Sequence, residues 1–226
     1  LPTGDELVPV GRLAAPGQVV ESNSHALAAA VREAGAEPLV FPVARDDAGA
    51  IRRALEAAAG LDALVTIGGV SVGARDLVRA ALARAGAKLD FWRVAMRPGK
   101  PFTFGRWGRT AVFGLPGNPA SSLVTFELFV RPALRALAGL PGTGRLRVTA
   151  RLASAQEKPP ALEVYLRARI RRVRGDLVAE PLRTQASGNL SSTAGHDALA
   201  VLPAGRARVA RGARVDAILL RPPHDA

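Results

Sequence analysis

The first 140 residues alternate between short apolar runs, typical of buried strands, and amphipathic stretches, typical of helices. Apolar residues recur at helical spacing after Ser22 or Asn23, again after Asp46, and again from Leu77. The residues that precede these stretches are good helix caps, and we expect Ser22 or Asn23 to cap the first helix.

Strand-like runs separate these helices. Residues 37–43 (EPLVFPV) are mostly apolar, and residues 62–67 are apolar almost without interruption, as expected for a strand buried on both faces. Strands that alternate with helices predict a parallel sheet covered by helices on both sides. The predicted fold class is therefore α/β, with three layers.

Between residues 89 and 113 the pattern changes to three short strand-like segments, 89–96, 101–104 and 109–113. The short turn at 105–108 predicts a hairpin between the last two segments. Neighbouring strands in a hairpin are antiparallel, so the predicted sheet is mixed.

A long helix is expected from about Ala120, with a kink at Pro132 because proline lacks the backbone donor that a helix needs. The Gly- and Pro-rich segment 139–144 then indicates a domain boundary. We therefore predict a first domain over residues 1–140 and a second over residues 141–226.

From residue 145 onward, apolar and polar positions alternate with a period of two. The first such run is LRVTARL (146–152), and a second covers residues 162–170. Shorter candidate strands, around Val178, Val201 and residues 215–218, are separated by Gly or Pro. The pattern is typical of a small β-barrel or sandwich, and we take the barrel as the prediction.

Composition narrows the classes of function. Apolar residues make up 48% of the 226 residues, which excludes a disordered chain. With no cysteine and three histidines, neither a disulfide framework nor a zinc site is expected. No segment resembles a signal peptide or a membrane span, so we expect a soluble, cytoplasmic protein. The chain starts without Met, and we expect it to be a piece of a longer protein.

The net charge of +12 has several interpretations. A basic surface can bind nucleic acid or attract small anions, and heavy Arg usage can also reflect compositional bias alone. Local placement is more informative, because residues 91–126 carry basic side chains and no acid. These basic residues are Arg93, Arg97, Lys100, Arg106 and Arg109.

A glycine-rich loop follows the most apolar strand, within VTIGGVSVGARD (65–76). Ligands gather at the carboxyl ends of strands in open α/β sheets, and glycines let backbone N–H groups approach an anion closely. We therefore expect Gly68, Gly69 and Ser71 to bind phosphate or another oxyanion. Asp76 closes the loop, and a carboxylate beside a phosphate site is explained by an intervening Mg²⁺.

Asp46 follows the preceding strand-like run in the same way. Asp46 and Asp76 are therefore expected at the same edge of the sheet, where a cation would relieve their mutual repulsion. The alternative for each aspartate is a helix cap, and Asp47 is another candidate for the cap of its helix. Two aspartates at corresponding strand ends favour the metal site more than one would.

Two further loops carry candidate ligands. GLPGNPASS (114–122) combines stiffening prolines with hydrogen-bonding side chains at a helix start, and its alternative is a rigid capped turn. MRPGKP (96–101) places Arg97 and Lys100 across a tight turn, where both can reach one anion, and its alternative is a solvated basic turn. Neither a Walker-type phosphate loop nor a Ser–His–Asp arrangement is found.

These segments together resemble the molybdopterin molybdotransferase family, which includes the C-terminal part of gephyrin. The similarity is dense from Thr3 to Leu140 and looser in the barrel, where QASGNLSS (185–192) is the clearest match. The matching segments are, in order, TGDEL (3–7), SN (22–23), RDD (45–47), GGVSVGARD (68–76), FWRVAMRPGKPFTFG (91–105) and GLPGNPAS (114–121).

The resemblance implies that the protein inserts molybdate into the dithiolene of molybdopterin, consuming adenylylated molybdopterin, requiring Mg²⁺ and releasing AMP. It implies an α/β molybdopterin-binding domain followed by a small β-barrel, with two N-terminal domains of the family absent from this chain. It also implies a homodimer that acts on small molecules, with neither a nucleic acid nor a membrane as partner.

The family's site residues carry over by position. Asp46, Asp76 and Glu6 match acidic residues implicated in metal binding or catalysis, with Asp46 and Asp76 as the metal ligands. The matched substrate-binding residues are Gly68, Gly69, Ser71, Gly73, Arg97, Lys100, Pro116, Asn118, Pro119, Ser121, Arg167 and Ser187. Arg93 and Arg97 stand where related sequences often carry Lys, which keeps the charge but changes the donor geometry.

Three alternatives remain open. A molybdopterin adenylyltransferase has a similar α/β domain, but its glycine loop usually reads GGTG and no barrel follows. A non-catalytic molybdopterin-binding scaffold would keep the fold without the chemistry. A nucleic-acid binder would explain the charge, but several aromatic residues among the basic ones alternate as expected for the core of strands.

Overall fold

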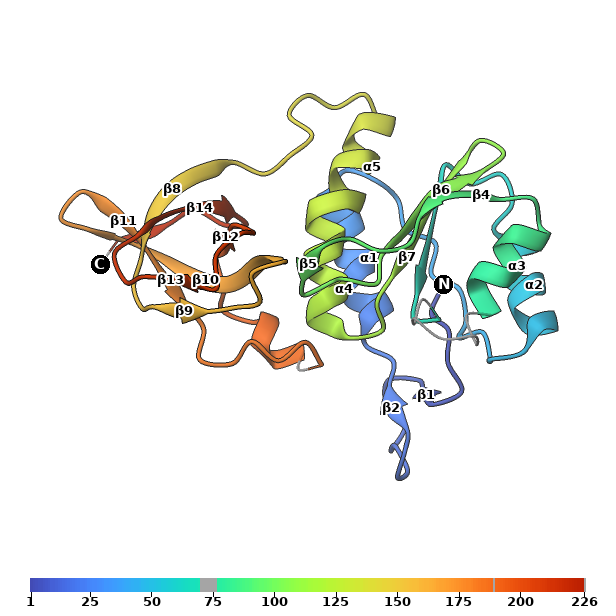
Figure 1. The fold of residues 1–226 in the computed structure, drawn as a ribbon. Helices are drawn as coiled ribbons and strands as arrows, with labels where there is room; N and C mark the ends of the chain where they lie inside the picture. The colour runs from blue at the N-terminus through green and yellow to red at the C-terminus, as the bar shows by residue number, and fades with distance from the viewer. Residues whose placement is uncertain (70–76, 189, 226) are drawn as a thin grey trace. The chain divides into compact units, whose positions relative to one another are not determined.

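The computed structural model describes residues 1–69, 77–188 and 190–225. They form two compact units (Figure 1). The first contains Leu1–Val94 and Pro101–Thr143, and the second contains Ala95–Lys100 and the chain from Gly144 onward. Among the helices of these described residues, none has the length and apolar character needed to cross a membrane.

The first unit is built on a mixed sheet. In spatial order its strands are β3 (Ala63–Ile67), β7 (Thr110–Leu115), β6 (Thr103–Trp107) and β4 (Lys88–Phe91). β3 and β7 are parallel, whereas β6 is antiparallel to both of its neighbours, which confirms the predicted mixed sheet. The hairpin turns at Gly108 and Arg109 rather than over 105–108, because Gly105 and Arg106 are still paired within β6.

Helices cover both faces of this sheet (Figure 1). α2 (Ala48–Ala57) and α3 (Leu77–Arg84) pack on one face, and α1 (Asn23–Glu33), α4 (Pro119–Thr125) and α5 (Arg131–Leu137) pack on the other. Successive side chains of a strand point to opposite faces. Leu64 and Val112 therefore enter the core under α2 and α3, while Ile67 and Phe113 enter the core under the other helices.

The predicted strand at residues 37–43 is wrong, because this segment has no regular secondary structure. Pro38 and Pro42 remove two backbone donors from it, and Leu39 and Val40 are 62% and 52% exposed. Pairing begins only after the second proline, where Ala44 forms an isolated parallel bridge with Thr3.

Ser22 occupies the predicted N-cap position of the first helix, but another residue supplies the capping bond. The side chain of Ser22 makes no capping hydrogen bond. The Glu21 carboxylate accepts the backbone N–H of Ser24 at 2.9 Å instead, and it also accepts the Ser24 hydroxyl. Asn23 lies inside α1 and uses its amide for a contact with Gly117. A carboxylate can satisfy an orphan donor of the first turn as well as a hydroxyl can.

The long helix predicted from Ala120 is interrupted by a π-helical turn, η1 (Phe126–Val130), which separates α4 from α5. Pro132 explains the interruption. Its ring crowds the carbonyl one turn earlier and cannot donate a hydrogen bond to it, so the helix widens just before the proline.

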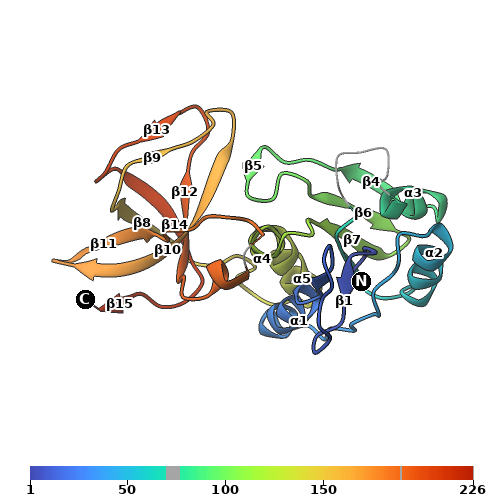
Figure 2. The same cartoon turned by 90° about the horizontal axis from the view of Figure 1, so that it is seen from below.

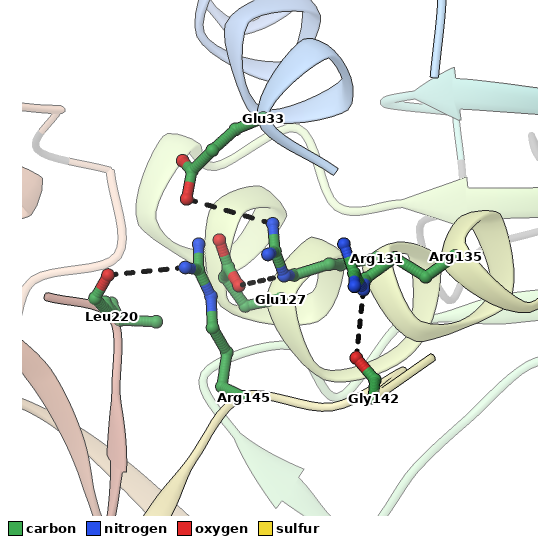
Figure 3. Close-up of polar contacts among 7 residues, drawn as sticks. All are labelled: Glu33, Glu127, Arg131, Arg135, Gly142, Arg145 and Leu220. Atoms are coloured by element: carbon green, nitrogen blue, oxygen red, sulfur yellow. Dashed lines mark hydrogen bonds and ion pairs between the residues drawn. The ribbon is translucent and has the colours of Figure 1, made fainter. Parts of the chain in front are cut away.

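Arg131 is a buried charge at this junction (Figure 3). Its Nε lies 3.8 Å from Glu127 Oε2 and its Nη1 lies 3.9 Å from Glu33 Oε1, while the residue is only 8% exposed. Glu33 belongs to α1, so the cluster joins α1 to α5. Figure 3 also shows Arg135 Nε donating to the carbonyl oxygen of Gly142 at 2.9 Å, which closes the segment after α5.

Replacing Arg131 with methionine is expected to destabilise the first unit by about 2 kcal/mol, because the mostly buried Glu127 loses the charge that faces it. Both tryptophans, Trp92 and Trp107, lie in this unit, so urea unfolding followed by tryptophan fluorescence measures it selectively. The control is the double variant Arg131→Met, Glu127→Gln, which should recover most of the loss. An equal loss in both variants would contradict the ion-pair explanation.

The second unit is a closed five-stranded β-barrel within the described residues (Figure 2). Its strands are β8 (Arg147–Leu152), β10 (Glu163–Val173), β11 (Asp176–Pro181), β12 (Ala198–Leu202) and β14 (Arg214–Leu219). The order β10-β12-β14-β8-β11 closes because β11 also pairs with β10. The predicted barrel is confirmed, and alternate residues such as Ala150, Leu152 and Val164 fill its core.

Shorter elements complete both units. In the first, β1 (Leu7–Val8) and β2 (Val19–Val20) form a parallel pair in an arm that projects from the sheet (Figure 1). In the second, β9 (Gln156–Glu157) pairs with β13 (Arg208–Val209), β15 (His224–Asp225) pairs with β10, and a 3₁₀ turn, η2 (Leu190–Thr193), precedes β12. Arg145 Nη1 donates to the carbonyl oxygen of Leu220 at 3.3 Å (Figure 3).

The strand β5 (Met96–Arg97) leaves the sheet of the first unit and joins the barrel. It runs parallel to the start of β10, with Met96 opposite Glu163 and Arg97 opposite Val164. The apolar pattern predicts one strand over residues 89–96, but the segment is divided between β4 and β5. Periodicity shows which face of a segment is apolar, and it does not show which distant strand the segment will pair with.

Candidate functional site

Loops from distant parts of the first unit meet at the carboxyl end of β3. The N–H and the hydroxyl of Thr3 donate to the carbonyl oxygen of Ile67 at 3.0 and 3.3 Å, so the N-terminal segment lies beside β3. On its other side, Gly4 N–H donates to the carbonyl oxygen of Ala44 at 3.1 Å. The N-terminal segment, the segment around Ala44 and the end of β3 therefore lie side by side at the same edge. This arrangement brings together the TGDE, RDD and GG motifs that follow them.

Gly68 and Gly69 are required by the close packing at this edge. Both have positive φ, 83° and 66°, and a Cβ on Gly68 would lie 2.8 Å from the carbonyl oxygen of Thr3. The Cα of Gly68 is also 3.7 Å from where a Cβ of Gly117 would be. The glycine loop and the GLPGNP loop are therefore adjacent, as a backbone site for an oxyanion would need.

The two neighbouring aspartates at this edge have different surroundings. Asp47 caps α2, because its side chain accepts the N–H of Ala50 at 2.8 Å. Asp46 is exposed, and its backbone N–H donates to Asp5 Oδ1 at 3.2 Å. The carboxylate of Asp46 makes no hydrogen bond or ion pair with any residue in 1–69, 77–188 or 190–225. The helix-cap alternative therefore applies to Asp47 and leaves the Asp46 carboxylate available to a ligand.

Two further acids extend the same edge. Arg45 Nη1 donates to the backbone carbonyl oxygen of Asp5 at 2.9 Å and lies 3.9 Å from its carboxylate. The Glu6 carboxylate folds over Gly4, and a Cβ on that glycine would be 2.5 Å from Glu6 Oε2. Both acids are exposed. The edge therefore combines glycine backbone with several carboxylates, one of which, on Asp5, already faces a cation.

The donor chemistry of this edge suits Mg²⁺, which prefers carboxylate and phosphate oxygens. Within the described part of the chain, no three Asp, Glu or His side chains lie close enough to hold a metal by themselves. A magnesium ion at Asp46 would therefore take its other oxygens from a substrate phosphate, from water or from Asp76.

Three of the predicted site residues, Ser71, Gly73 and Asp76, lie outside the described residues. The pairing of Asp46 with Asp76 as metal ligands stays a prediction. The same is true of an oxyanion contact from Ser71 or Gly73.

The GLPGNP loop (114–119) is tied down on both sides. The hydroxyl of Ser122 donates to the carbonyl oxygen of Pro116, and the amide of Asn23 donates to that of Gly117 at 2.7 Å. The loop then enters α4 through Pro119. The predicted substrate-binding residues of this segment are Pro116, Asn118, Pro119 and Ser121.

The other predicted anion ligands fall in the second unit. Arg97 and Lys100 are exposed, and the side chain of neither makes a hydrogen bond or ion pair with a residue that the structure describes. Arg167 lies on β10, the strand that pairs with β5, and Ser187 lies on the loop between β11 and β12. The structure thus brings these four residues into one compact unit and places Ser121 in the other.

Arg167 is fully buried rather than exposed to an anion. Its Nη2 donates to the carbonyl oxygens of Ala186 and Thr184 at 3.2 and 3.4 Å, and burial lowers the pKa of its guanidinium. Burial also lowers the pKa of His196, which ends the same loop, so its imidazole is neutral at pH 7. In this structure Arg167 binds the backbone of the loop that carries Ser187.

Two residues hold these loops although their motifs did not predict that role. They are Asn23, which bonds to the GLPGNP loop, and Gln185, whose side-chain amide bonds to the backbone of Arg167. Both stand in recognisable motifs, SN and QASGNLSS. A motif cannot show which distant backbone an amide will contact, so no further signal for these contacts exists in the sequence.

Residues 1–136 match the family described as the probable molybdopterin binding domain, and residues 149–220 match the MoeA C-terminal region (domain IV). A molybdopterin molybdenumtransferase from Nostoc sp. is 40% identical over 216 residues, which cover 93% of this chain and 50% of that relative. Molybdopterin molybdenumtransferase 2 from Mycobacterium tuberculosis is 37% identical over 219 residues, which cover 94% of this chain and 54% of that relative.

Solved structures agree with these matches. The crystal structure of the molybdopterin biosynthesis MoeA protein from Pyrococcus horikosii has a TM-score of 0.82 at 30% identity, covering 98% of this chain and 53% of that chain. This chain spans about half the length of the curated relatives it matches. The predicted family resemblance is confirmed: the chain belongs to the family of the probable molybdopterin binding domain, followed by a MoeA C-terminal region.

Proposed function

We propose that this protein is a molybdopterin molybdenumtransferase, which inserts molybdate into adenylylated molybdopterin and releases AMP in molybdenum cofactor biosynthesis. The observation that carries this proposal is the division of chemistry between the two units. The first unit offers glycine backbone and an Asp46 carboxylate that makes no hydrogen bond or ion pair with the described side chains or backbone groups, which suits a metal-bound pyrophosphate. The second offers exposed Arg97 and Lys100, which suit a tetrahedral dianion.

Each residue then has a role in the proposed reaction. Asp46, with Asp76 as the second acid, holds Mg²⁺, and the bound ion neutralises charge on the pyrophosphate that is broken. Glu6 is a further acid at that edge, and Gly68 and Gly69 let the backbone approach a phosphate. The remaining substrate-binding roles belong to Arg97, Lys100 and Ser187 of the second unit for molybdate, and to Ser71, Gly73, Pro116, Asn118, Pro119 and Ser121 in the loops of the first unit.

Replacing Arg97 with glutamine is expected to weaken molybdate binding about thirtyfold, because a charge-assisted hydrogen bond worth roughly 2 kcal/mol is lost. Titration calorimetry with molybdate measures this directly. Arg109→Gln is the matched control, because Arg109 is an exposed arginine in the turn of the β6–β7 hairpin. The assignment of Arg97 would be refuted if both variants bound molybdate as tightly as the unaltered protein.

A homodimer and a cytoplasmic location belong to the same proposal. Sedimentation of the purified protein tests whether it is a dimer.

The adenylyltransferase alternative is less favoured, because residues 149–220 match a MoeA domain that follows the α/β unit. AMP transfer onto molybdopterin, without molybdate insertion, would reverse that preference. An anion-binding protein that releases no AMP would instead support the scaffold.

A further inference from the structure

One edge of β10 is completed by a side chain rather than by a strand. Alternate residues of a strand direct their N–H and C=O groups to the same edge. On the edge used by the odd-numbered residues, Glu163 N–H donates to the carbonyl oxygen of Ala95, and Arg169 pairs with Glu180 of β11. Arg167 lies between these two positions, outside the residue pairs of β5 and β11, and only its carbonyl oxygen is met by the segment after β11, where it accepts the N–H of Leu182.

Gln185 occupies this gap. Its Oε1 accepts the N–H of Arg167 at 3.1 Å, and its Nε2 donates to the carbonyl oxygen of Arg167 at 2.9 Å. These are the two bonds that a residue of a neighbouring strand would make. The Nε2 of Gln185 also donates to the carbonyl oxygen of Leu182 at 3.0 Å. The N–H of Leu182 in turn donates to the carbonyl oxygen of Arg167 at 2.8 Å. The amide therefore ties its own loop to β10.

Arg167 completes the arrangement from the opposite direction. Its buried guanidinium donates to the carbonyl oxygens of Thr184 and Ala186, the residues on either side of Gln185. The Gln185 side chain thus bonds to the backbone of Arg167, and the Arg167 side chain bonds to the backbone on either side of Gln185. Ser187 is the next residue after this segment. A fully buried arginine is costly unless its donors are used, and here those of Nη2 are directed at the loop.

We propose that Gln185 and Arg167 form a clamp that positions Ser187 and its backbone on the same edge of β10 as the Arg97 loop, and that the clamp sets the protein's affinity for a tetrahedral oxyanion. Glu163 and Arg167 are four residues apart, so the two loops are about 13 Å apart along the strand. Both residues of the clamp are positioning residues. The inference rests on the proposed function for the identity of the anion, molybdate.

Gln185→Met tests the clamp, because methionine keeps the length of the side chain and loses the three hydrogen bonds of the amide. We expect molybdate affinity, measured by calorimetry, to fall about tenfold. We also expect amide hydrogen exchange over residues 184–188 to accelerate at least as much, with the rest of the barrel unchanged. Gln156→Met is the matched control: Gln156 lies on β9, and within the described residues its side chain bonds locally, through Nε2 to Ser154 Oγ at 2.9 Å. Both readouts should stay as in the unaltered protein.

Faster exchange with unchanged molybdate affinity would overturn the link between the clamp and the anion, and unchanged exchange would overturn the clamp itself. If Gln185→Met does not fold, Gln185→Asn, which keeps the amide but is one methylene too short, gives the same two readouts. If the unaltered protein binds no molybdate, the proposed function has failed, while hydrogen exchange still decides whether Gln185 orders the loop.

Discussion

Replacing Asp46 with alanine is expected to reduce Mg²⁺-dependent AMP release from adenylylated molybdopterin by roughly 100-fold or more, equivalent to about 3 kcal/mol of transition-state stabilisation. Stability should change by less than about 0.5 kcal/mol, because the carboxylate is exposed and makes no contact within the described residues that folding would lose. Single-turnover AMP release at saturating molybdate measures the first effect, and urea unfolding measures the second.

The adjacent residue provides a matched control with the opposite expectation. Asp47→Ala removes the side chain that caps α2 and should cost about 1 kcal/mol of stability while leaving AMP release nearly unchanged. The two variants differ by one position and remove the same group. If Asp47→Ala lost the activity and Asp46→Ala kept it, the metal-binding role of Asp46 would be wrong.

Gly68→Ala is expected to destabilise the first unit by about 3 kcal/mol or more. A residue with a Cβ is disfavoured by about 1–2 kcal/mol at positive φ, and here the new Cβ would also lie 2.8 Å from the carbonyl oxygen of Thr3. Relief of that contact requires the segment beside β3 to move. Urea unfolding followed by tryptophan fluorescence reports on this unit, which contains both tryptophans.

Gly86→Ala separates the two contributions. Gly86 has nearly the same φ, 86° against 83°, but a Cβ there would meet nothing within 4 Å. The control should therefore lose only the conformational part, about 1 kcal/mol. Equal losses in the two variants would show that the packing of the glycine loop against Thr3 contributes little, and that the loop has room for a side chain.

Much of the fold was predictable because it is encoded locally. The buried run at 62–67 forms β3, the helical spacing after Asp46 forms α2, and the period-two pattern from residue 145 forms a barrel. The failures are equally local in origin. Residues 37–43 are apolar enough for a strand, but their two prolines leave too few backbone N–H donors for pairing. A prediction based on the number of apolar residues does not take these missing donors into account.

The candidate site was predictable only as a set of residue types. Glycines, acids and basic residues in recognisable motifs were enough to indicate oxyanion chemistry. They were not enough to show that Arg97 belongs to the barrel unit or that Arg167 is buried against a loop. Both facts depend on which edge of β10 is left open by β11, a long-range property that no window of sequence contains.

By itself, the sequence determined most of the strands and helices, the glycine positions and the family, since each follows from local periodicity, turn chemistry or motif spacing. Only the tertiary structure decided that Asp47 caps α2 while Asp46 does not, and that Gln185 takes the place of a strand beside Arg167. The physical reason is common to both. A hydrogen bond is chosen by the donors and acceptors that the folded backbone brings within reach, and residues with the same chemistry compete for them until the fold is complete.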